Sequence, residues 1–262
     1  MHLGEKSMDA HAPAFAHGPI REIFPDIFFV TGASVFEYEG NSIQKSNNMV
    51  IVRNGDELTL INTLRLNKDG LEALDKLGKV TNVIRLGAFH DRNDAFFLDR
   101  YKAKLWALKG MVHKNNHQTD FLIGETDAIP FPGVSFFVFE TTSHPEAILH
   151  VARLGGILIA CDSIKNWEKV DEYFSEKTGK EFLKQGLIAP ANIDTIWLGA
   201  MKPRCSDFLR LKKLSFRHLL SAHGQPIINT AREQLMPTLE RLSNSIYNYS
   251  GSPAVIPAKA GS

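Results

Sequence analysis

Short runs of apolar residues dominate the first third of the chain and predict β-strands. Such runs, bounded by polar or turn-forming residues, are typical of buried strands. They occupy positions 27–30, 33–36, 49–52 and 58–61. The last two runs flank Asn54-Gly55, a pair that favours tight hairpin turns because both residues tolerate positive φ. The sequence therefore predicts a strand-rich start with a hairpin at these two residues.

Strands and helices alternate from there on, which is the pattern of an α/β fold. Leu71, Leu74 and Leu77 recur at helical spacing, and Gly78 supplies a stop. Further strands are predicted at residues 83–86, 105–108, 134–139, 193–198 and 219–222, with a hairpin formed by 147–152 and 157–161. Further helices are predicted at residues 94–101, within 166–190, and at 207–214.

The last predicted helix has an N-terminal capping motif, but a proline lies within its apolar stripe. Thr230-x-x-Glu233 is a capping box, which satisfies two backbone N–H groups at a helix start. Pro237 follows within the apolar stripe. Because proline has no N–H to donate, it should kink this helix or mark its true start.

One domain is expected over residues 20–248. The first 19 residues are rich in Ala, His, Pro and Gly without periodicity, which predicts a flexible leader at residues 1–19. The Pro- and Ala-rich end predicts a disordered tail at residues 249–262. A chain of 262 residues can bury a large core, and we favour one large domain over two small ones.

Charge and composition exclude several classes of protein. The 30 basic and 29 acidic residues leave a net charge of +1, which argues against binding nucleic acid or a membrane surface by bulk electrostatics. The 2 cysteines form no CxxC pair. No apolar run reaches the length of a membrane span, and the N-terminus lacks the apolar core of a secretory signal. We expect a cytoplasmic protein that acts on a small molecule, without nucleic-acid or membrane partners; a homodimer is the assembly considered.

Five residues able to bind a metal ion stand where predicted strands run out into loops. Strand ends gather reactive groups in sheet-based folds, because the sheet is rigid and the loops vary. Imidazole nitrogens and carboxylate oxygens suit Zn²⁺, and a bound ion can activate water for hydrolysis. These candidate metal ligands are His90, Asp94, His144, Asp162 and His223.

The motifs around these residues carry a resemblance to a known family. They read FHDRND, TTSHPE, ACDS and SAHGQP in chain order. This order resembles the metallo-β-lactamase superfamily, in which a strand ends in H-x-H-x-D-H and a later loop gives a His. A hairpin strand then ends in a bridging Asp, and a final strand ends in His followed by Gly. The resemblance, over about residues 20–245, implies that His144 is the middle ligand, Asp162 the bridging carboxylate and His223 the last ligand.

The same resemblance implies a fold. The family fold is an αββα sandwich, in which two mixed β-sheets pack face to face and helices flank them. Its site lies at one edge of the sandwich, among the loops that follow the strands. We therefore expect a metallo-β-lactamase-like α/β sandwich with its candidate ligands at one edge.

The first motif departs from the family pattern. His90 and Asp94 fall on a family His and the family Asp, but Arg92 and Ala95 stand where the family has its other two histidines. Asn62 stands where the family places an Asp that braces the site. Two imidazoles are thus missing, so a two-metal clamp is not expected. The resemblance implies at most one divalent ion, with zinc favoured, or none.

Arg92 has two interpretations. A guanidinium stays protonated and does not ligate a metal. It can form a bidentate pair with Asp94 or Asp162 and replace the charge of the metal with its own. Alternatively, it points outward and holds an anionic group of the substrate.

Two functions follow from these residues. The first is a hydrolase with an altered, mononuclear metal centre that activates water against a small ester, lactone, amide or phosphoester, with Asp94 and Arg92 as the predicted catalytic residues. The alternative is a catalytically inactive binding or structural module in which Arg92 replaces the metal charge. A nuclease is disfavoured, because nucleases typically clamp the reacting oxygens with two metals.

Simpler roles remain open for two residues near these motifs. Asp94 is also a favoured residue type for capping the helix that follows it. Cys161 alternates away from Asp162 on its predicted strand, so we expect it to be a buried structural thiol rather than a ligand.

Overall fold

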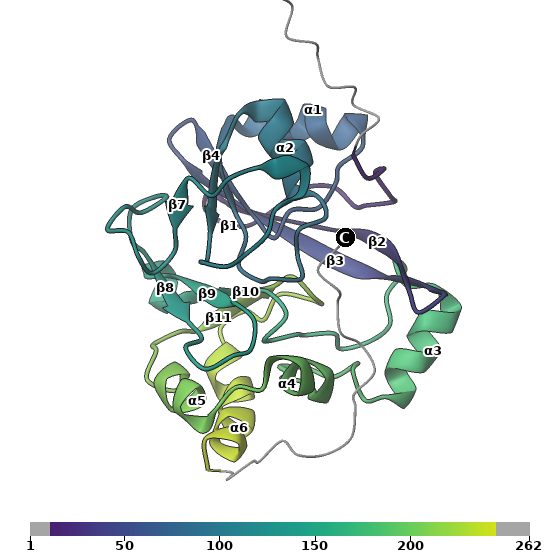
Figure 1. The fold of residues 1–262 in the computed structure, drawn as a ribbon, viewed down its shortest axis with the longest axis vertical. Helices are drawn as coiled ribbons and strands as arrows, with labels where there is room; N and C mark the ends of the chain where they lie inside the picture. The colour runs from purple at the N-terminus through teal and green to yellow at the C-terminus, as the bar shows by residue number, and fades with distance from the viewer. Residues whose placement is uncertain (1–10, 245–262) are drawn as a thin grey trace, which may run out of the picture.

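Two β-sheets lie face to face in the computed structural model, and helices cover the outer face of each sheet (Figure 1). The structure describes residues 11–244. Both sheets contain parallel and antiparallel pairs. This is the αββα sandwich of two mixed sheets that the sequence predicted.

Seven strands form the larger sheet and follow one another across it in chain order. Antiparallel pairing joins the first four strands, and parallel pairing joins the fourth to the seventh. The strands are β1 (Arg21–Phe24), β2 (Ile27–Tyr38), β3 (Asn41–Asn54), β4 (Glu57–Ile61), β5 (Lys79–Ile84), β6 (Lys104–Ala107) and β7 (Phe121–Leu122).

Four strands form the smaller sheet, in the order β11-β10-β9-β8. Its strands are β8 (Val134–Val138), β9 (Ala147–Val151), β10 (Ile157–Ala160) and β11 (His218–Ser221). β10 and β11 run parallel, whereas the other two pairs are antiparallel. The chain therefore leaves β10 and β11 at the same edge of this sheet.

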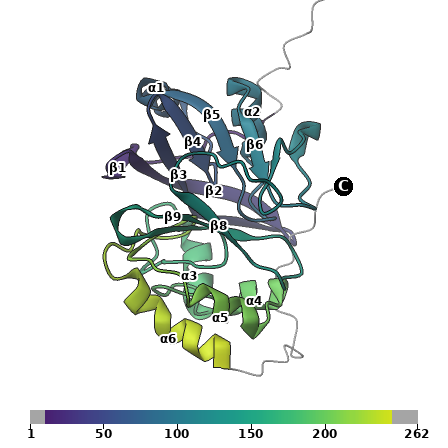
Figure 2. The ribbon, with the colours of Figure 1, turned by 90° about the vertical axis from the view of Figure 1, so that its left-hand side faces the viewer.

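Most α-helices of the described residues cover the two outer faces. The helices are α1 (Lys68–Leu77), α2 (Asp94–Tyr101), α3 (Glu176–Lys184), α4 (Thr195–Met201), α5 (Cys205–Leu211) and α6 (Ala231–Asn244). Of these, α3 packs instead against strand β3 near the end of the β2–β3 hairpin (Figure 1). Figure 2 shows α1 and α2 on the side of the larger sheet and α4, α5 and α6 on the side of the smaller one. None of the helices in the described part of the chain is long and apolar enough to cross a membrane.

Apolar side chains fill the space between the sheets and the space under the helices. Phe29 and Val50 of the larger sheet pack with Leu149 and Ile159 of the smaller sheet in the central layer. A second cluster lies between the larger sheet and its helices, and a third lies between the smaller sheet and α4 to α6. The sheets are thus fixed against each other by a continuous apolar layer, which provides a rigid base for the loops at the edge.

The first predicted elements are confirmed, with one change. β3 and β4 form the hairpin around Asn54-Gly55, and Gly55 has a φ of +61°. α1 ends at Leu77, directly before Gly78. The apolar runs 27–30 and 33–36 belong to one strand of 12 residues rather than two, because the polar residues between them continue the ladder with β3.

The strand predicted at 193–198 is wrong, because this segment begins helix α4. Asp194 is the N-cap, and its side chain accepts a hydrogen bond of 2.8 Å from the backbone N–H of Trp197. Asp194 also forms an ion pair of 2.5 Å with Lys165. A short apolar run does not by itself distinguish a strand from a buried helical turn. Here Asp194 caps the run and stabilises it as a helix.

Pro237 lies inside helix α6 rather than at its start. The helix begins at Ala231, directly after Thr230. The backbone N–H of Gln234 donates to the carbonyl oxygen of Thr230, which closes the first turn. Of the two positions predicted for Pro237, the interior one is confirmed.

Part of the predicted leader lies along strand β2. Residues 1–10 and the predicted tail lie outside the described residues. Backbone hydrogen bonds of 2.8 Å join Gly18 to Thr31 and Ala33 to Ala16. His11 forms an ion pair of 3.2 Å with Asp99. Residues 11–19 are therefore held against the domain by main-chain and side-chain contacts.

Replacing Asp194 by alanine should destabilise the fold more than the loss of a helix cap alone. The variant Asp194→Ala loses the cap, which costs about 1 kcal/mol, and it leaves the half-buried Lys165 without its partner. Breaking a buried pair costs about 3–5 kcal/mol. Since Lys165 keeps some exposure, we expect a total loss of about 2–4 kcal/mol in the free energy of unfolding, measured by urea denaturation.

The matched control is Asn67→Ala, which removes the exposed N-cap of α1 without touching an ion pair. It should cost about 1 kcal/mol. Equal losses for the two variants would show that the Asp194–Lys165 pair contributes nothing to stability.

Candidate metal centre

The candidate site lies where the loops after several strands meet at one edge of the sandwich. Asp162 follows β10 and His223 follows β11. Because these two strands are parallel neighbours, their ends bring the two residues together. His90 lies between β5 and α2 and approaches from the larger sheet. Loops from both sheets therefore supply the site.

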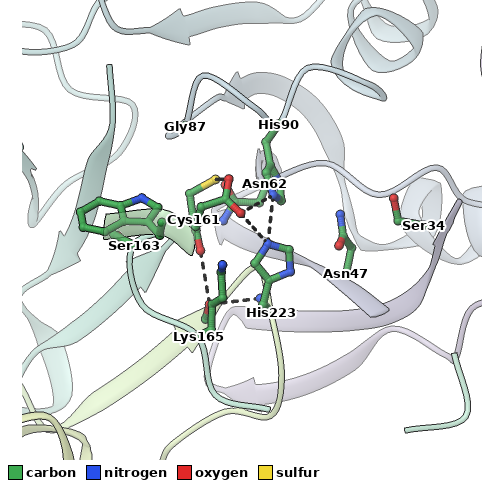
Figure 3. Close-up of polar contacts among 12 residues, drawn as sticks. Ser34, Asn47, Asn62, Gly87, His90, Cys161, Ser163, Lys165 and His223 are labelled. Carbon is green, nitrogen blue, oxygen red and sulfur yellow. Dashed lines mark hydrogen bonds and ion pairs between the residues drawn. The ribbon is translucent and has the colours of Figure 1, made fainter. Parts of the chain in front are cut away.

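Three ligand atoms of these residues form a close triangle (Figure 3). His223 Nε2 lies 2.8 Å from Asp162 Oδ1, His90 Nε2 lies 3.4 Å from the same oxygen, and the two Nε2 atoms are 3.2 Å apart. Two neutral imidazoles cannot both point a proton into such a space. The triangle is therefore suited to a shared proton or to a cation.

The triangle has the dimensions of a zinc site. Zinc lies about 2.0–2.1 Å from imidazole nitrogen and carboxylate oxygen, so the ligand atoms of a tetrahedral site lie about 3.4 Å apart. The three sides of 2.8, 3.2 and 3.4 Å are close to this value. Two imidazoles and a carboxylate are also ligand types that zinc takes in proteins. The residues present thus fit one divalent ion.

Cys161 is buried, as predicted, but it lies beside the triangle rather than pointing away from Asp162. Together with His90 and Asp162 it forms a group whose ligand atoms all lie within 4.8 Å of one another. β10 ends at Ala160, so the alternation of side chains along a strand does not extend to Cys161 and Asp162. Burial, together with the nearby Asp162 and Glu146, raises the pKa of the thiol well above its usual value.

His223 is fully buried and held on both sides. Its ring packs against Trp167 at a centroid distance of 4.9 Å. Lys45 Nζ lies 3.3 Å from His223 Nδ1, on the side of the ring away from Asp162. Burial, with a further effect of Lys45, lowers the pKa of His223 well below its usual value. The imidazole is therefore neutral at physiological pH, as a metal ligand must be.

Lys45 can form a hydrogen bond with His223 in either of its protonation states. Burial lowers the pKa of Lys45 to about 7, although Asp162 opposes the shift. A charged amine donates to Nδ1, whereas a neutral amine can accept a proton shared from Nδ1–H. Histidines that bind a metal usually donate their second ring N–H to a carboxylate, a carbonyl or water; here a lysine amine takes that place. Lys45 Nζ also donates to Asn47 Oδ1 at 2.8 Å, which fixes its position.

The backbone around His223 is fixed by strand β3. Asn48 Nδ2 donates to the carbonyl oxygens of Ser221 at 2.9 Å and Gly224 at 2.6 Å. Gly224 has a φ of +88°, and an added Cβ would lie 1.9 Å from the carbonyl oxygen of Asn166. Only glycine fits this position. The Gly of the SAHG motif is thus explained by the close approach of a neighbouring chain segment.

Asp162 is ionised in this environment. Burial alone would raise its pKa, but His90 and His223 outweigh burial and hold the pKa well below its usual range. Its buried neighbour Glu146 accepts hydrogen bonds from Ser163 N and Trp197 Nε1. Burial and the charge of Asp162 raise the pKa of Glu146 to about 8. One negative charge therefore remains at the triangle, on Asp162.

Asp94 lies behind the triangle rather than in it. It is the first residue of α2, whose N-cap is Asn93. Its Oδ1 accepts a hydrogen bond of 2.6 Å from Thr63 Oγ1, and its buried Oδ2 has no hydrogen-bond partner in the described part of the chain. Burial raises the pKa of Asp94 to about 6. The structure thus brings Asp94 near His90 without joining it to the group of converging ligand atoms.

His144 lies away from the converging ligand atoms. Its side chain is exposed and packs edge-on against Phe89 at a centroid distance of 5.2 Å. The structure therefore brings together His90, Asp162 and His223 among the five predicted ligands, and it leaves His144 on the surface.

Arg92 points toward strand β2. Its Nη1 donates to the carbonyl oxygen of Val35 at 2.9 Å and contacts Ser34 Oγ at 3.4 Å. Its guanidinium carbon lies 4.7 Å from the centre of the Phe36 ring. Among the described residues, no carboxylate lies within ion-pair distance of Arg92. The predicted bidentate pair with Asp94 or Asp162 is therefore not formed.

Asn62 braces the site as the resemblance implied for its position. Its Nδ2 donates to the carbonyl oxygen of Ala160 at 2.9 Å, the residue directly before Cys161. Asn62 has a φ of +55°, a conformation in which asparagine is enriched. The end of β4 is thus tied to the end of β10, beside the candidate ligands.

A cavity of about 630 Å³ opens beside the triangle. Its size falls in the range of sites for small molecules. Aromatic and aliphatic side chains make up much of its wall, and polar groups cluster near the triangle. The residues that reach it from the triangle are His90, Asp162 and His223, and the cations that reach it are Lys45, Arg92 and Lys165.

Sequence reasoning missed Lys45, Lys165 and Trp167. Only Lys45 lies in a segment that stands out in the sequence, because residues 41–48 are mostly polar. In the structure these residues belong to strand β3, and Ser46 and Asn48 are buried. Buried polar groups need hydrogen-bond partners. The partner of Lys45 lies 178 residues further along the chain, so no local pattern identifies it.

Comparison with solved structures identifies the fold. The metallo-β-lactamase DIM-1 matches with a TM-score of 0.56 at 13% identity, over 87% of this chain and 98% of that chain. A metallo-β-lactamase from Pontibacter korlensis matches with a TM-score of 0.55 at 13% identity, over 86% and 99% of the two chains. FIM-1 from Pseudomonas aeruginosa, in its mono-zinc form, matches with a TM-score of 0.55 at 13% identity, over 87% and 98%.

No protein-family model matches the chain, and no curated protein sequence does so either. At identities of 13% the likeness to solved structures establishes the fold alone. The chain is a protein of the metallo-β-lactamase fold.

Proposed function

We propose that this protein is a metal-dependent hydrolase with a mononuclear centre formed by His90, Asp162 and His223. The observation that carries the proposal is the triangle of three ligand atoms 2.8 to 3.4 Å apart, set beside a cavity of about 630 Å³. Zinc is the metal that this donor set favours. The mono-zinc form of FIM-1, a protein of the same fold, supports a single ion.

His90 and His223 supply two nitrogen ligands, and the ionised Asp162 supplies one negative charge. Lewis acidity and water activation are the chemistry that a divalent ion supplies when bound there. His144 is left out of the proposed ligand set because it lies on the surface. Cys161 is a further ligand within reach, since a thiol is deprotonated when it coordinates a metal.

The surrounding residues orient the ligands and limit access of water. Lys45 fixes the ring of His223 from its far side. Trp167 and Trp197 line the cavity and reduce the water around the reacting bond, which strengthens electrostatic interactions there. The proposed substrates are small esters, lactones, amides or phosphoesters, whose hydrolysis such a centre promotes.

The inactive alternative in which Arg92 replaces the metal has less support. In the described structure Arg92 forms no ion pair with Asp162 or Asp94, and its hydrogen bonds go to strand β2. Arg92 therefore does not neutralise the carboxylate that the metal would bind.

Metal analysis tests the centre directly. Protein purified without chelator should contain about one equivalent of zinc per chain. His90→Ala and the double variant His223→Ala/Cys161→Ala should each lower the metal content below about a tenth of an equivalent, because two converging protein ligands do not close a zinc site. Metal content is measured by inductively coupled plasma mass spectrometry.

His144→Ala is the control for this series. Because His144 is exposed and outside the triangle, this variant should retain its zinc. Loss of zinc on replacing His144, with zinc retained after replacing His90, would overturn the proposed ligand set.

Esterase activity tests the function. The purified protein should hydrolyse a generic substrate such as p-nitrophenyl acetate, and a chelator should abolish the reaction. Asp162→Asn should lower kcat/KM by more than about 100-fold, since a change even to the partners of ligands costs about 10- to 100-fold. Asp26→Asn, which alters a surface pair with Arg53, should leave the rate unchanged. Hydrolysis that survives the chelator would contradict a metal-dependent reaction.

A further inference from the structure

The cavity beside the triangle contains a guanidinium without an acidic partner. Arg92 lines this cavity, and its hydrogen bonds to the described residues use Nη1 alone. No carboxylate among residues 11–244 lies within ion-pair distance of it. Burial lowers the pKa of Arg92, yet a guanidinium stays protonated in proteins. The charge of Asp91 opposes the effect of burial, but no carboxylate of the described residues pairs directly with the guanidinium.

The other charged groups of the cavity do not supply the missing negative charge. Asp162 is engaged by two imidazoles, and Lys165 takes Asp194 as its partner. Lys45 has no ion pair among the described residues either. Glu37 and Glu39 belong to the tip of the β2–β3 hairpin, where both are exposed to water. Arg92 and Lys45 are therefore the cations lining the cavity that have no ion pair among the described residues.

Apolar side chains line much of the rest of the cavity. Aromatic rings and branched side chains offer it a surface that excludes water and suits a hydrophobic or aromatic group. These residues include Ile43, Trp167, Phe182, Leu187, Ile196 and Trp197. The cavity thus combines cations, apolar side chains and the candidate metal ligands.

We propose that the substrate carries an anionic group, which Arg92 binds, and an apolar or aromatic body, which lies against the wall of Trp167 and Phe182. This inference rests on the proposed function, because it places the bond to be hydrolysed at the triangle. A guanidinium binds carboxylate or phosphate through two parallel N–H···O bonds. The unused N–H groups of Arg92 are available for this contact, and Val35 and Phe36 hold the guanidinium in place.

Binding without hydrolysis tests this inference separately from the metal centre. Isothermal titration calorimetry in the presence of EDTA compares the affinity for 4-phenylbutyrate with that for its neutral analogue 4-phenylbutanamide. Phenyl phosphate is titrated as the ligand that carries a phosphate in place of the carboxylate. At least one anion should bind at least tenfold more tightly than the amide, since hydrogen bonds to charged groups are the stronger ones. The tighter anion identifies the group as carboxylate or phosphate.

Variants of Arg92 assign the preference to this residue. Arg92→Gln should weaken anion binding at least tenfold and leave amide binding unchanged, whereas Arg92→Lys should retain part of the preference. The control Arg100→Gln removes a guanidinium of helix α2 that pairs with Asp75 and does not line the cavity, and it should change nothing. Thermal unfolding of each variant shows that it is folded.

Three results would overturn the inference. The first is equal affinity for the amide and both anions. The second is an anion preference that persists in folded Arg92→Gln. The third is anion binding that disappears with EDTA, because the anion would then be a ligand of the metal rather than of Arg92. Failure of zinc binding by the protein affects none of these measurements, so the two proposals fail independently.

Discussion

The contact between strand β3 of the larger sheet and the turn after β11 of the smaller sheet is the constraint on which the site depends. Asn48 reaches across the sandwich and bonds the carbonyl oxygens of Ser221 and Gly224, which fixes His223 between them. The same strand carries Lys45 to the far side of the imidazole. Parallel pairing of β10 with β11 then sets Asp162 beside His223. Loss of this contact would leave the ligands on independent loops.

This contact gathers ionisable groups in a buried place, where some are compensated by neighbours of opposite charge and others are not. Asp162 stays charged because His90 and His223 face it, whereas its neighbour Glu146 has a pKa raised to about 8. The cations Lys45 and Arg92 have no ion pair among the described residues. Such an arrangement is costly to fold unless ligands complete it, and perturbed groups in a cleft are typical of functional sites. A metal cation at the triangle would compensate Asp162, and a substrate anion at Arg92 would compensate the guanidinium.

Local pattern predicted most of the elements, and the resemblance carried by the chain order of the motifs implied that distant strand ends converge at one edge. His90, Asp162 and His223 follow strands whose carboxyl ends meet at one edge, so their proximity was predictable. The direction in which the His144 side chain points was not predictable, since the chain can turn either way once it leaves a strand. Lys45 escaped because its role depends on a partner 178 residues away. The helix α4 escaped because its cap, Asp194, was read as part of a strand.

Anomalous scattering at the zinc edge, from crystals grown with one equivalent of zinc, locates the ion. We predict one strong peak within bonding distance of His90 Nε2, His223 Nε2 and Asp162 Oδ1. A peak at the second histidine–carboxylate cluster, where His11 and His117 flank Asp99, with none at the triangle, would contradict it. So would the absence of any peak within bonding distance of these three atoms.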